Sequence, residues 1–136
     1  MSGSGLAWQP SLFERESIKV DTSFTDLAHS DLGSGAWVEY VPNWVEGAGK
    51  LFEDLLDAAE WRSRVVHMYE RKLREPRLTS RWELEGGEVP LPVLGEIAQV
   101  LGERYAVRFT SVGCNLYRNG SDSVAWHGDR VARDLP

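Results

Sequence analysis

The chain has 136 residues, of which 42% are hydrophobic and 26% are charged, and its formal net charge is −6. These values suit one soluble globular domain rather than two, with enough residues to bury a core without a disulfide or a metal. The single cysteine, Cys114, excludes an intramolecular disulfide, and no run of about 18 apolar residues exists for a membrane span. We therefore expect a protein of the reducing cytoplasm that has no membrane partner.

The beginning of the chain differs in composition from the rest. It opens with serine and glycine residues, and we expect residues 1–16 to be a mobile N-terminal segment ahead of a domain at residues 17–136. In the first part of that domain, the pattern predicts short strands at Ile18–Val20 and Ala36–Val41, with a turn at Gly33–Gly35.

Two amphipathic helices are predicted further along the chain. Apolar residues recur at helical spacing between acidic residues, which predicts a helix over Glu46–Ala59. Pro92 is suited to the first turn of a second helix, Val93–Arg104, whose apolar residues fall on one face. Apolar and polar residues then alternate, which predicts a half-buried strand over Tyr105–Ser111.

Basic residues are concentrated in one segment. Residues 62–81 contain seven bases and two acids, a local net charge of +5 in an acidic chain. Pro76 prevents a helix from continuing through the end of this segment. Such a local field can bind phosphates even though the total charge opposes binding of a polyanion, and the alternative is an ordinary solvated surface.

The last part of the chain predicts two strands joined by a turn. Asn115–Tyr117 continues a strand pattern, Arg118–Ser121 contains Asn-Gly and predicts the turn, and Ser123–Asp129 predicts the second strand. Because side chains alternate along a strand, His127 and Asp129 project to the same side. An imidazole and a carboxylate placed in this way can bind one divalent metal ion.

Side-chain direction also constrains how the two predicted strands are joined. Asn115 and Tyr117 share one face, and Tyr117 shares a face with His127 only if the loop has an odd length of about three or five residues. Trp126 and Cys114 point away from these faces, and we expect both in the core. His-x-Asp alone is a weak signal, and its alternative interpretation is a strand-end histidine followed by a solvated turn residue.

The string NLYRNGSDSVAWHGD, residues 115–129, resembles the core motif of the AlkB-like dioxygenases, which depend on non-haem iron and 2-oxoglutarate. The pattern of that family is Asn-x-Tyr, a turn with a small residue, an acid and an apolar position, and then His-x-Asp. The resemblance covers residues 40–136, and residues 68–69 and 76–79 look like the nucleotide-recognition region of the family.

The resemblance implies a role for each matched residue. His127 and Asp129 would be ligands of Fe(II), and Asn115 and Tyr117 would donate hydrogen bonds to 2-oxoglutarate. Members of the family remove alkyl groups from nucleobases by hydroxylating the alkyl carbon, which then leaves as an aldehyde. The function implied for this chain is repair of alkylated DNA by oxidative dealkylation, with RNA or protein as the alternative substrate.

The resemblance also implies how nucleic acid would bind. A flipped base would lie between His127 and an aromatic side chain, for which Tyr69 and Trp82 are the two candidates. Arg77 and the rest of the basic segment would contact phosphates. The alternative for the two aromatic residues is core packing, and the alternative for Arg77 is an ordinary surface position.

The fold that the resemblance implies is α+β, the N-terminal part of a double-stranded β-helix (jelly-roll) dioxygenase with flanking helices. The later strands of the family, its distal iron-binding histidine and the arginines that pair with 2-oxoglutarate are not matched between Asp129 and Pro136. We therefore expect a truncated family member whose catalysis is impaired or absent. The alternative function is a non-catalytic fragment that binds nucleic acid weakly.

Overall fold

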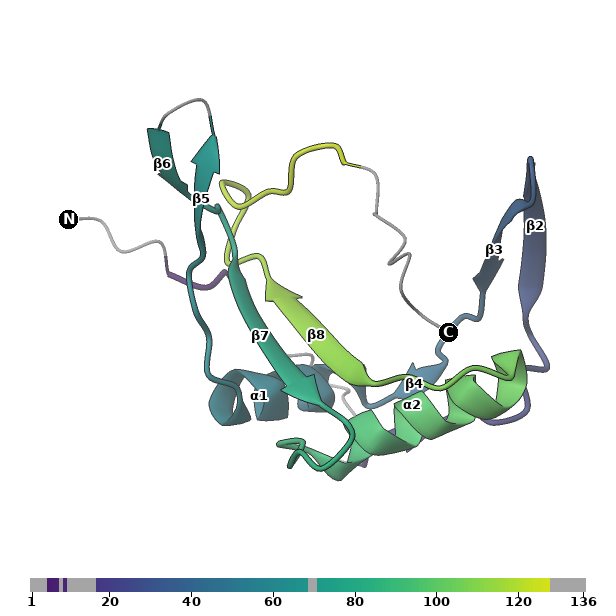
Figure 1. Ribbon diagram of the computed structural model, residues 1–136. Coiled ribbons are helices and arrows are strands. Elements are labelled where there is room, and N and C mark those ends of the chain that lie inside the picture. The colour runs from purple at the N-terminus through teal and green to yellow at the C-terminus, as the bar shows by residue number, and fades with distance from the viewer. Residues whose placement is uncertain (1–4, 8, 10–16, 69–70, 128–136) are drawn as a thin grey trace. The chain divides into compact units, whose positions relative to one another are not determined.

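The computed structural model describes the chain over residues 5–7, 9, 17–68 and 71–127. Within these residues it contains short strands and two helices, which confirms the predicted α+β class (Figure 1). The chain divides into two compact units, the first formed by residues 1–8, 61–80 and 114–136 and the second by residues 9–60 and 81–113. Most of the predicted N-terminal segment, residues 1–16, lies outside the described residues.

Both helices belong to the second unit. Helix α1 (Ala48–Ala58) and helix α2 (Pro92–Tyr105) agree with the predicted helices to within two residues at each end. Pro92 lies in the first turn of α2, where the N–H that proline lacks would have no intrahelical partner. Neither helix among the described residues is long and apolar enough to cross a membrane.

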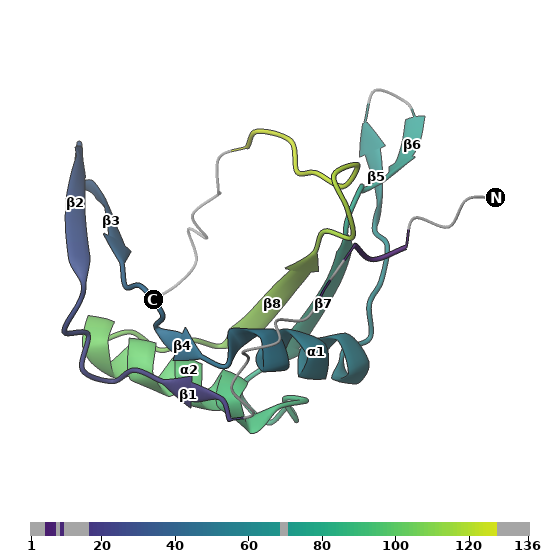
Figure 2. The same ribbon diagram turned by 180° about the vertical axis from the view of Figure 1, so that it is seen from behind.

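A short strand pair precedes α1 in the same unit. Strand β1 (Lys19–Val20) pairs antiparallel with β4 (Val45–Glu46), and Figure 2 shows the two from behind, in purple and blue. Gly47 follows β4 with a φ of 71°, and a Cβ atom at Gly47 would lie 2.5 Å from the carbonyl oxygen of Ser17. Only glycine therefore fits at the junction between β4 and α1.

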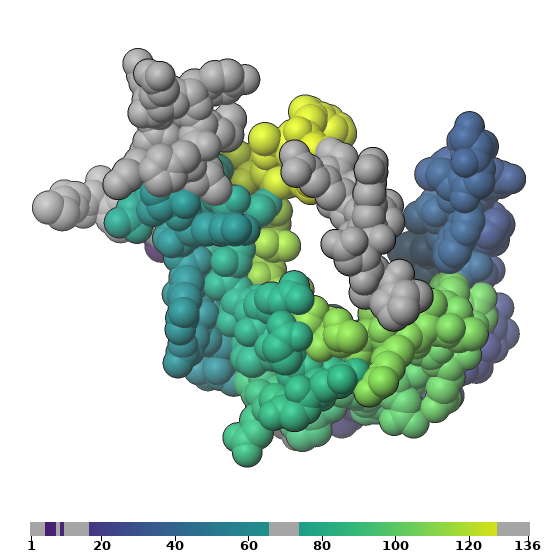
Figure 3. Space-filling model, in the orientation of Figure 1, coloured from purple at the N-terminus to yellow at the C-terminus, as the bar shows by residue number. Residues whose placement is uncertain are grey.

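Strands β2 (Ala28–Gly33) and β3 (Ala36–Tyr40) form an antiparallel hairpin around the predicted turn at Gly33–Gly35. The hairpin, drawn in blue in Figure 3, extends beyond the rest of the second unit. Its large side chains are well exposed, with Trp37 at 51% and Tyr40 at 66%. The hairpin therefore depends on a few specific contacts rather than on a buried face.

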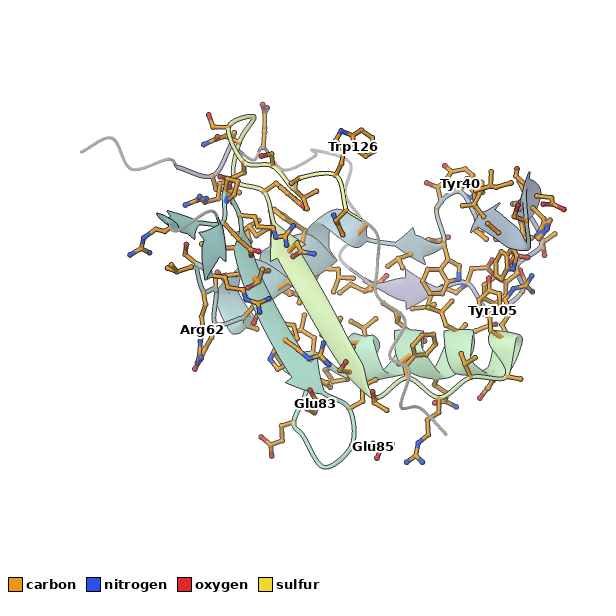
Figure 4. All side chains as sticks on the ribbon, turned by 45° about the horizontal axis from the view of Figure 1, so that its top comes forward. Tyr40, Arg62, Glu83, Glu85, Tyr105 and Trp126 are labelled. Atoms are coloured by element: carbon orange, nitrogen blue, oxygen red, sulfur yellow. The ribbon has the colours of Figure 1, made fainter. Side chains whose placement is uncertain are left out.

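Glu39 on β3 joins the hairpin to the end of α2. Its carboxylate accepts hydrogen bonds from the hydroxyl of Tyr105 and, at 3.4 Å, from the guanidinium of Arg104. His29 on β2 places Nδ1 3.1 Å from the same carboxylate. The Trp37 ring stacks between the rings of His29 and Tyr105, with centroid distances of 5.6 and 5.9 Å. Figure 4 labels Tyr105 at this contact.

The remaining strands include part of the basic segment. Strand β5 (Val65–Met68) pairs antiparallel with β6 (Arg71–Arg74), so this segment forms a hairpin and not a helix. Strand β7 (Leu78–Glu83) pairs with β8 (Ser111–Leu116) in a separate two-stranded sheet. The first half of β7 and the second half of β8 belong to the first unit, and the other halves belong to the second.

The strand predicted at Tyr105–Ser111 is wrong. Tyr105 is the last residue of α2, Ala106 ends the helix with a φ of 52°, and residues 107–110 are not in a strand. The apolar residues do alternate after Tyr105. However, the hydroxyl of Tyr105 donates a hydrogen bond to Glu39, and this bond holds Tyr105 in the last turn of α2. The strand begins only at Ser111.

The strand predicted at Ser123–Asp129 is also wrong for the residues that the structure describes. Residues 123–127 are not in a strand, and the backbone N–H of Ser123 donates instead to the carbonyl of Pro76 at 2.8 Å. Trp126, predicted in the core, is fully exposed, as its labelled side chain in Figure 4 illustrates. The alternation argument fails here because no second strand pairs with this segment.

Replacing Glu39 with glutamine should release the hairpin from α2. Hydrogen bonds from Tyr105, and then from His29 and Arg104, lower the pKa of Glu39 below its ordinary value of 4.5. A lowered carboxylate pKa gives stabilisation that is present above the ordinary value and is lost as the pH falls through the lower, folded value. The measurement is the fluorescence emission of Trp37. It is obtained by subtracting the spectrum of the Trp37→Phe variant from the spectrum of the same chain with Trp37 present.

We expect the Trp37 emission of Glu39→Gln at pH 7 to resemble that of the unmodified chain after Glu39 is protonated. Glu53→Gln, which changes an exposed acid on α1, should leave the emission unchanged. A Glu39→Gln variant with unaltered Trp37 emission at pH 7 would contradict this role of Glu39.

Candidate functional site

Strand β8 sets the direction of Asn115 and Tyr117. Leu116, at the end of β8, is 7% exposed, whereas Tyr117 immediately after it is 43% exposed and Asn115 is also exposed. Because side chains alternate along a strand, the Asn115 amide and the Tyr117 phenol lie on the face opposite Leu116, as the sequence predicts. Both groups can donate hydrogen bonds to a carboxylate.

A tight turn follows Tyr117 at Asn119–Asp122, close to the predicted position. The N–H of Asp122 donates to the carbonyl of Asn119 at 3.0 Å, and the N–H of Ser121 donates to the Asn119 side chain at 2.9 Å. The Arg118 guanidinium donates to the Asp122 carboxylate from Nε at 2.7 Å and from Nη2 at 2.9 Å. These bonds favour both charged forms, so the pKa of Asp122 is lowered and that of Arg118 is raised.

His127 lies ten residues after Tyr117 and is exposed. Its Nδ1 atom is 2.8 Å from the carbonyl oxygen of Ala125. A carbonyl oxygen only accepts, so this contact favours a proton on Nδ1, and a neutral imidazole in that tautomer would bind a metal through Nε2. Asp129, the second predicted ligand, lies outside the described residues. Within the part of the chain that is described, no three His, Cys, Asp or Glu side chains gather as a metal site.

The predicted substrate-binding residues have different surroundings. The guanidinium of Arg77 lies 3.6 Å from the Glu75 carboxylate, and each side chain is 19% exposed. Glu75 Oε2 and Arg77 Nε are buried and lack a hydrogen-bond partner within the described structure. Trp82 is half-buried on β7 in the second unit, and Tyr69 lies outside the described residues.

The second unit has two hollows, and neither is lined by a residue that the sequence predicts to bind iron, 2-oxoglutarate or nucleic acid. One, of about 460 Å³, lies along α2 and includes Ala98 and Phe109. The other, of about 390 Å³, includes Asp21 on the loop after β1 and Glu46 at the end of β4. The predicted residues Asn115, Tyr117 and His127 all belong to the first unit, where they lie at the end of β8 and in the segment that follows it.

Sequence reasoning did not predict the ion pair between Arg118 and Asp122. The two residues have opposite charges four positions apart, on either side of an Asn-Gly turn. That spacing is a usable signal, because an i to i+4 separation across a tight turn brings two side chains to the same place, as it does on a helix.

Comparisons with known proteins place the motif in context. No protein-family model matches the chain. Among curated proteins it is similar to the alpha-ketoglutarate-dependent dioxygenase alkB homolog 3 of Bos taurus, with 29% identity over 93% of this chain and 46% of that protein. The Homo sapiens protein of the same name is 29% identical over 89% of this chain and 44% of its own length. The Mus musculus protein of the same name is 27% identical over 89% of this chain and 44% of its own length.

The relatives that this chain matches are dioxygenases that depend on alpha-ketoglutarate, another name for 2-oxoglutarate. Within that class they confirm the resemblance to the AlkB-like family that the motif at residues 115–129 predicted. The chain spans less than half the length of the curated relatives that it matches.

The single cysteine gives a direct test of how β8 is oriented. Burial raises the pKa of the Cys114 thiol above its ordinary value of 9.0, and only the thiolate reacts with alkylating reagents. We expect iodoacetamide at pH 8 to modify folded Cys114 at least about fivefold more slowly than it modifies the same chain in concentrated urea. Equal rates in the two conditions would show that Cys114 is not shielded, and that the predicted faces of β8 are wrong.

Proposed function

We propose that this chain is an AlkB-like dioxygenase that removes alkyl groups from nucleobases in DNA by oxidation. The observation that carries the proposal is its similarity to alkB homolog 3, which extends over 93% of the chain and accompanies a complete Asn-x-Tyr and His-x-Asp motif. We further propose that residues 17–136 belong to a jelly-roll domain, of which the described strands form a part.

The donor groups of the candidate site fit iron and 2-oxoglutarate. The contact between His127 Nδ1 and the Ala125 carbonyl favours the tautomer that would bind a metal through Nε2. Together with 2-oxoglutarate and O₂, bound Fe(II) supplies hydroxylation of an alkyl carbon, which is then released as an aldehyde. His127 and Asp129 would hold the iron, and Asn115 and Tyr117 would orient 2-oxoglutarate by donating to its carboxylates.

The basic segment supports nucleic acid as the substrate. Arg64 directly precedes β5 and Arg74 is the last residue of β6, and both are exposed. The backbone bond from the N–H of Glu75 to the carbonyl of Arg64, next to the pairing of Val65 with Arg74, joins the two strands at the open end of the hairpin. Their guanidinium groups would bind phosphates, whereas Arg77 is already beside the carboxylate of Glu75.

The catalytic proposal is tested by succinate formation from 2-oxoglutarate, with Fe(II), O₂ and single-stranded DNA that carries an N-methylated base. Because we expect catalysis to be impaired in this chain, we predict slow formation of succinate and formaldehyde in equal amounts, at a rate that His127→Ala lowers about 100-fold, since a metal ligand is lost. His29→Ala, which changes an exposed histidine in the second unit, should leave the rate within about twofold.

Other outcomes of this assay distinguish the remaining possibilities. Turnover on methylated RNA and not on methylated DNA would show that the substrate is RNA and would contradict the proposed DNA substrate. DNA binding by the unmodified chain with no succinate at saturating cofactors would contradict catalysis and favour the non-catalytic, nucleic-acid-binding alternative.

The phosphate contacts are tested by the salt dependence of binding to single-stranded DNA. Each contact to a single strand contributes about 0.7 to the slope of log affinity against log salt concentration. The double variant Arg64→Ala/Arg74→Ala should therefore lower the magnitude of that slope by about 1.4. Arg108→Ala removes an exposed arginine that pairs with Glu85 in the second unit, and it should leave the slope unchanged. Equal slopes for the double variant and the unmodified chain would rule out these contacts.

A further inference from the structure

The connection between Tyr117 and His127 is closed by an ion pair that is largely shielded from water. The Asp122 side chain is 5% exposed and the Arg118 side chain is 28% exposed. The Asp122 carboxylate accepts three hydrogen bonds from Arg118, two from the guanidinium and one from the backbone N–H at 2.8 Å. A bidentate pair of this kind fixes both direction and distance, which a single contact between charges does not.

The backbone on either side of the ion pair is tied to other segments of the same unit. The carbonyl of Arg118 accepts a hydrogen bond from the N–H of Ala7 at 2.7 Å, and the N–H of Ser123 donates to the carbonyl of Pro76 at 2.8 Å. Asn119 closes the turn between them through both its side chain and its carbonyl. The turn is therefore constrained at its entrance, at its centre and at its exit.

Tyr117 directly precedes this constrained turn, and His127 follows Ser123, the residue at the exit of the turn, by four positions. Strand β8 ends directly before Tyr117, whereas residues 123–127 are not assigned to any strand in the described part of the chain. The place where the chain leaves the turn toward His127 therefore depends on the ion pair between Arg118 and Asp122.

We propose that Arg118 and Asp122 are positioning residues that set the separation between the group that holds 2-oxoglutarate, Tyr117, and the metal ligand, His127. This inference rests on the proposed function. Both charged groups are satisfied by each other, so neither is expected to touch the cofactors. They act through the backbone that joins the two functional side chains.

The test measures the affinity of the 136-residue chain for Fe(II) and for 2-oxoglutarate by calorimetry. Oxygen is excluded so that 2-oxoglutarate is not consumed during the measurement. Asp122→Asn keeps the shape of the side chain but removes the charge that binds Arg118. Loss of an outer residue that orients metal ligands costs about 10- to 100-fold in affinity. We therefore expect both dissociation constants of Asp122→Asn to rise at least about tenfold, and Asp122→Glu, which restores the charge, to recover part of the loss.

Asp54→Asn is the matched control. Lys50 and Asp54 form an ion pair with the same i to i+4 spacing, at 2.8 and 2.9 Å, on α1 in the second unit. Its loss should leave both dissociation constants within about twofold, because a helix surface pair contributes little to stability and nothing to the site. All binding is measured at a temperature where circular dichroism shows each variant to be folded.

Three results are informative. A tenfold loss of both affinities in Asp122→Asn, with faster amide hydrogen exchange at Tyr117 and His127 than in Asp54→Asn, supports the inference. A lower melting temperature with unchanged affinities overturns it, because the pair would then be only structural. If the unmodified chain binds neither Fe(II) nor 2-oxoglutarate, the proposed function itself fails and the positioning role fails with it.

Discussion

The two-residue alternation of a β-strand is the constraint on which the candidate site depends. On β8 it buries Leu116 and thereby turns Asn115 and Tyr117 to the opposite, exposed face. A one-residue shift in that strand would move both polar side chains into the core and expose Leu116. The same apolar residue that stabilises the strand therefore determines where an amide and a phenol are available to a ligand.

Much of the architecture could be predicted from patterns within short stretches of sequence. Both helices were predicted because their apolar spacing and, for α2, the position of Pro92 are local signals. The turn near Asn119 was predicted for the same reason, since Asn-Gly specifies backbone conformation without help from the rest of the chain. The faces of Asn115 and Tyr117 followed from counting along a strand that does form.

The errors occurred where a distant partner decides between two local possibilities. The alternation after Tyr105 is genuine, but a hydroxyl bond to Glu39, 66 residues earlier, and stacking on Trp37 hold that residue at the end of a helix. Residues 123–127 also alternate, but the amide of Ser123 bonds to Pro76 instead of to a neighbouring strand. Trp126 is exposed as a result, because alternation predicts burial only where a second layer covers one face.

The basic residues of the chain show both a local sequence signal and the effect of contacts that the sequence pattern does not reveal. The basic segment was visible in the sequence as a net charge of +5, yet its arginines differ in what they can bind. Arg77 lies beside Glu75 and is mostly buried, whereas Arg64 and Arg74 are exposed at the open end of a hairpin. Within the described residues, a phosphate would meet charge at Arg64 and Arg74 that no acidic side chain is seen to balance. At Arg77 the carboxylate of Glu75 weakens the field that would attract an anion. The sequence thus locates the positive region of an acidic chain, and the ion pairs within it decide which guanidinium groups remain to meet a polyanion.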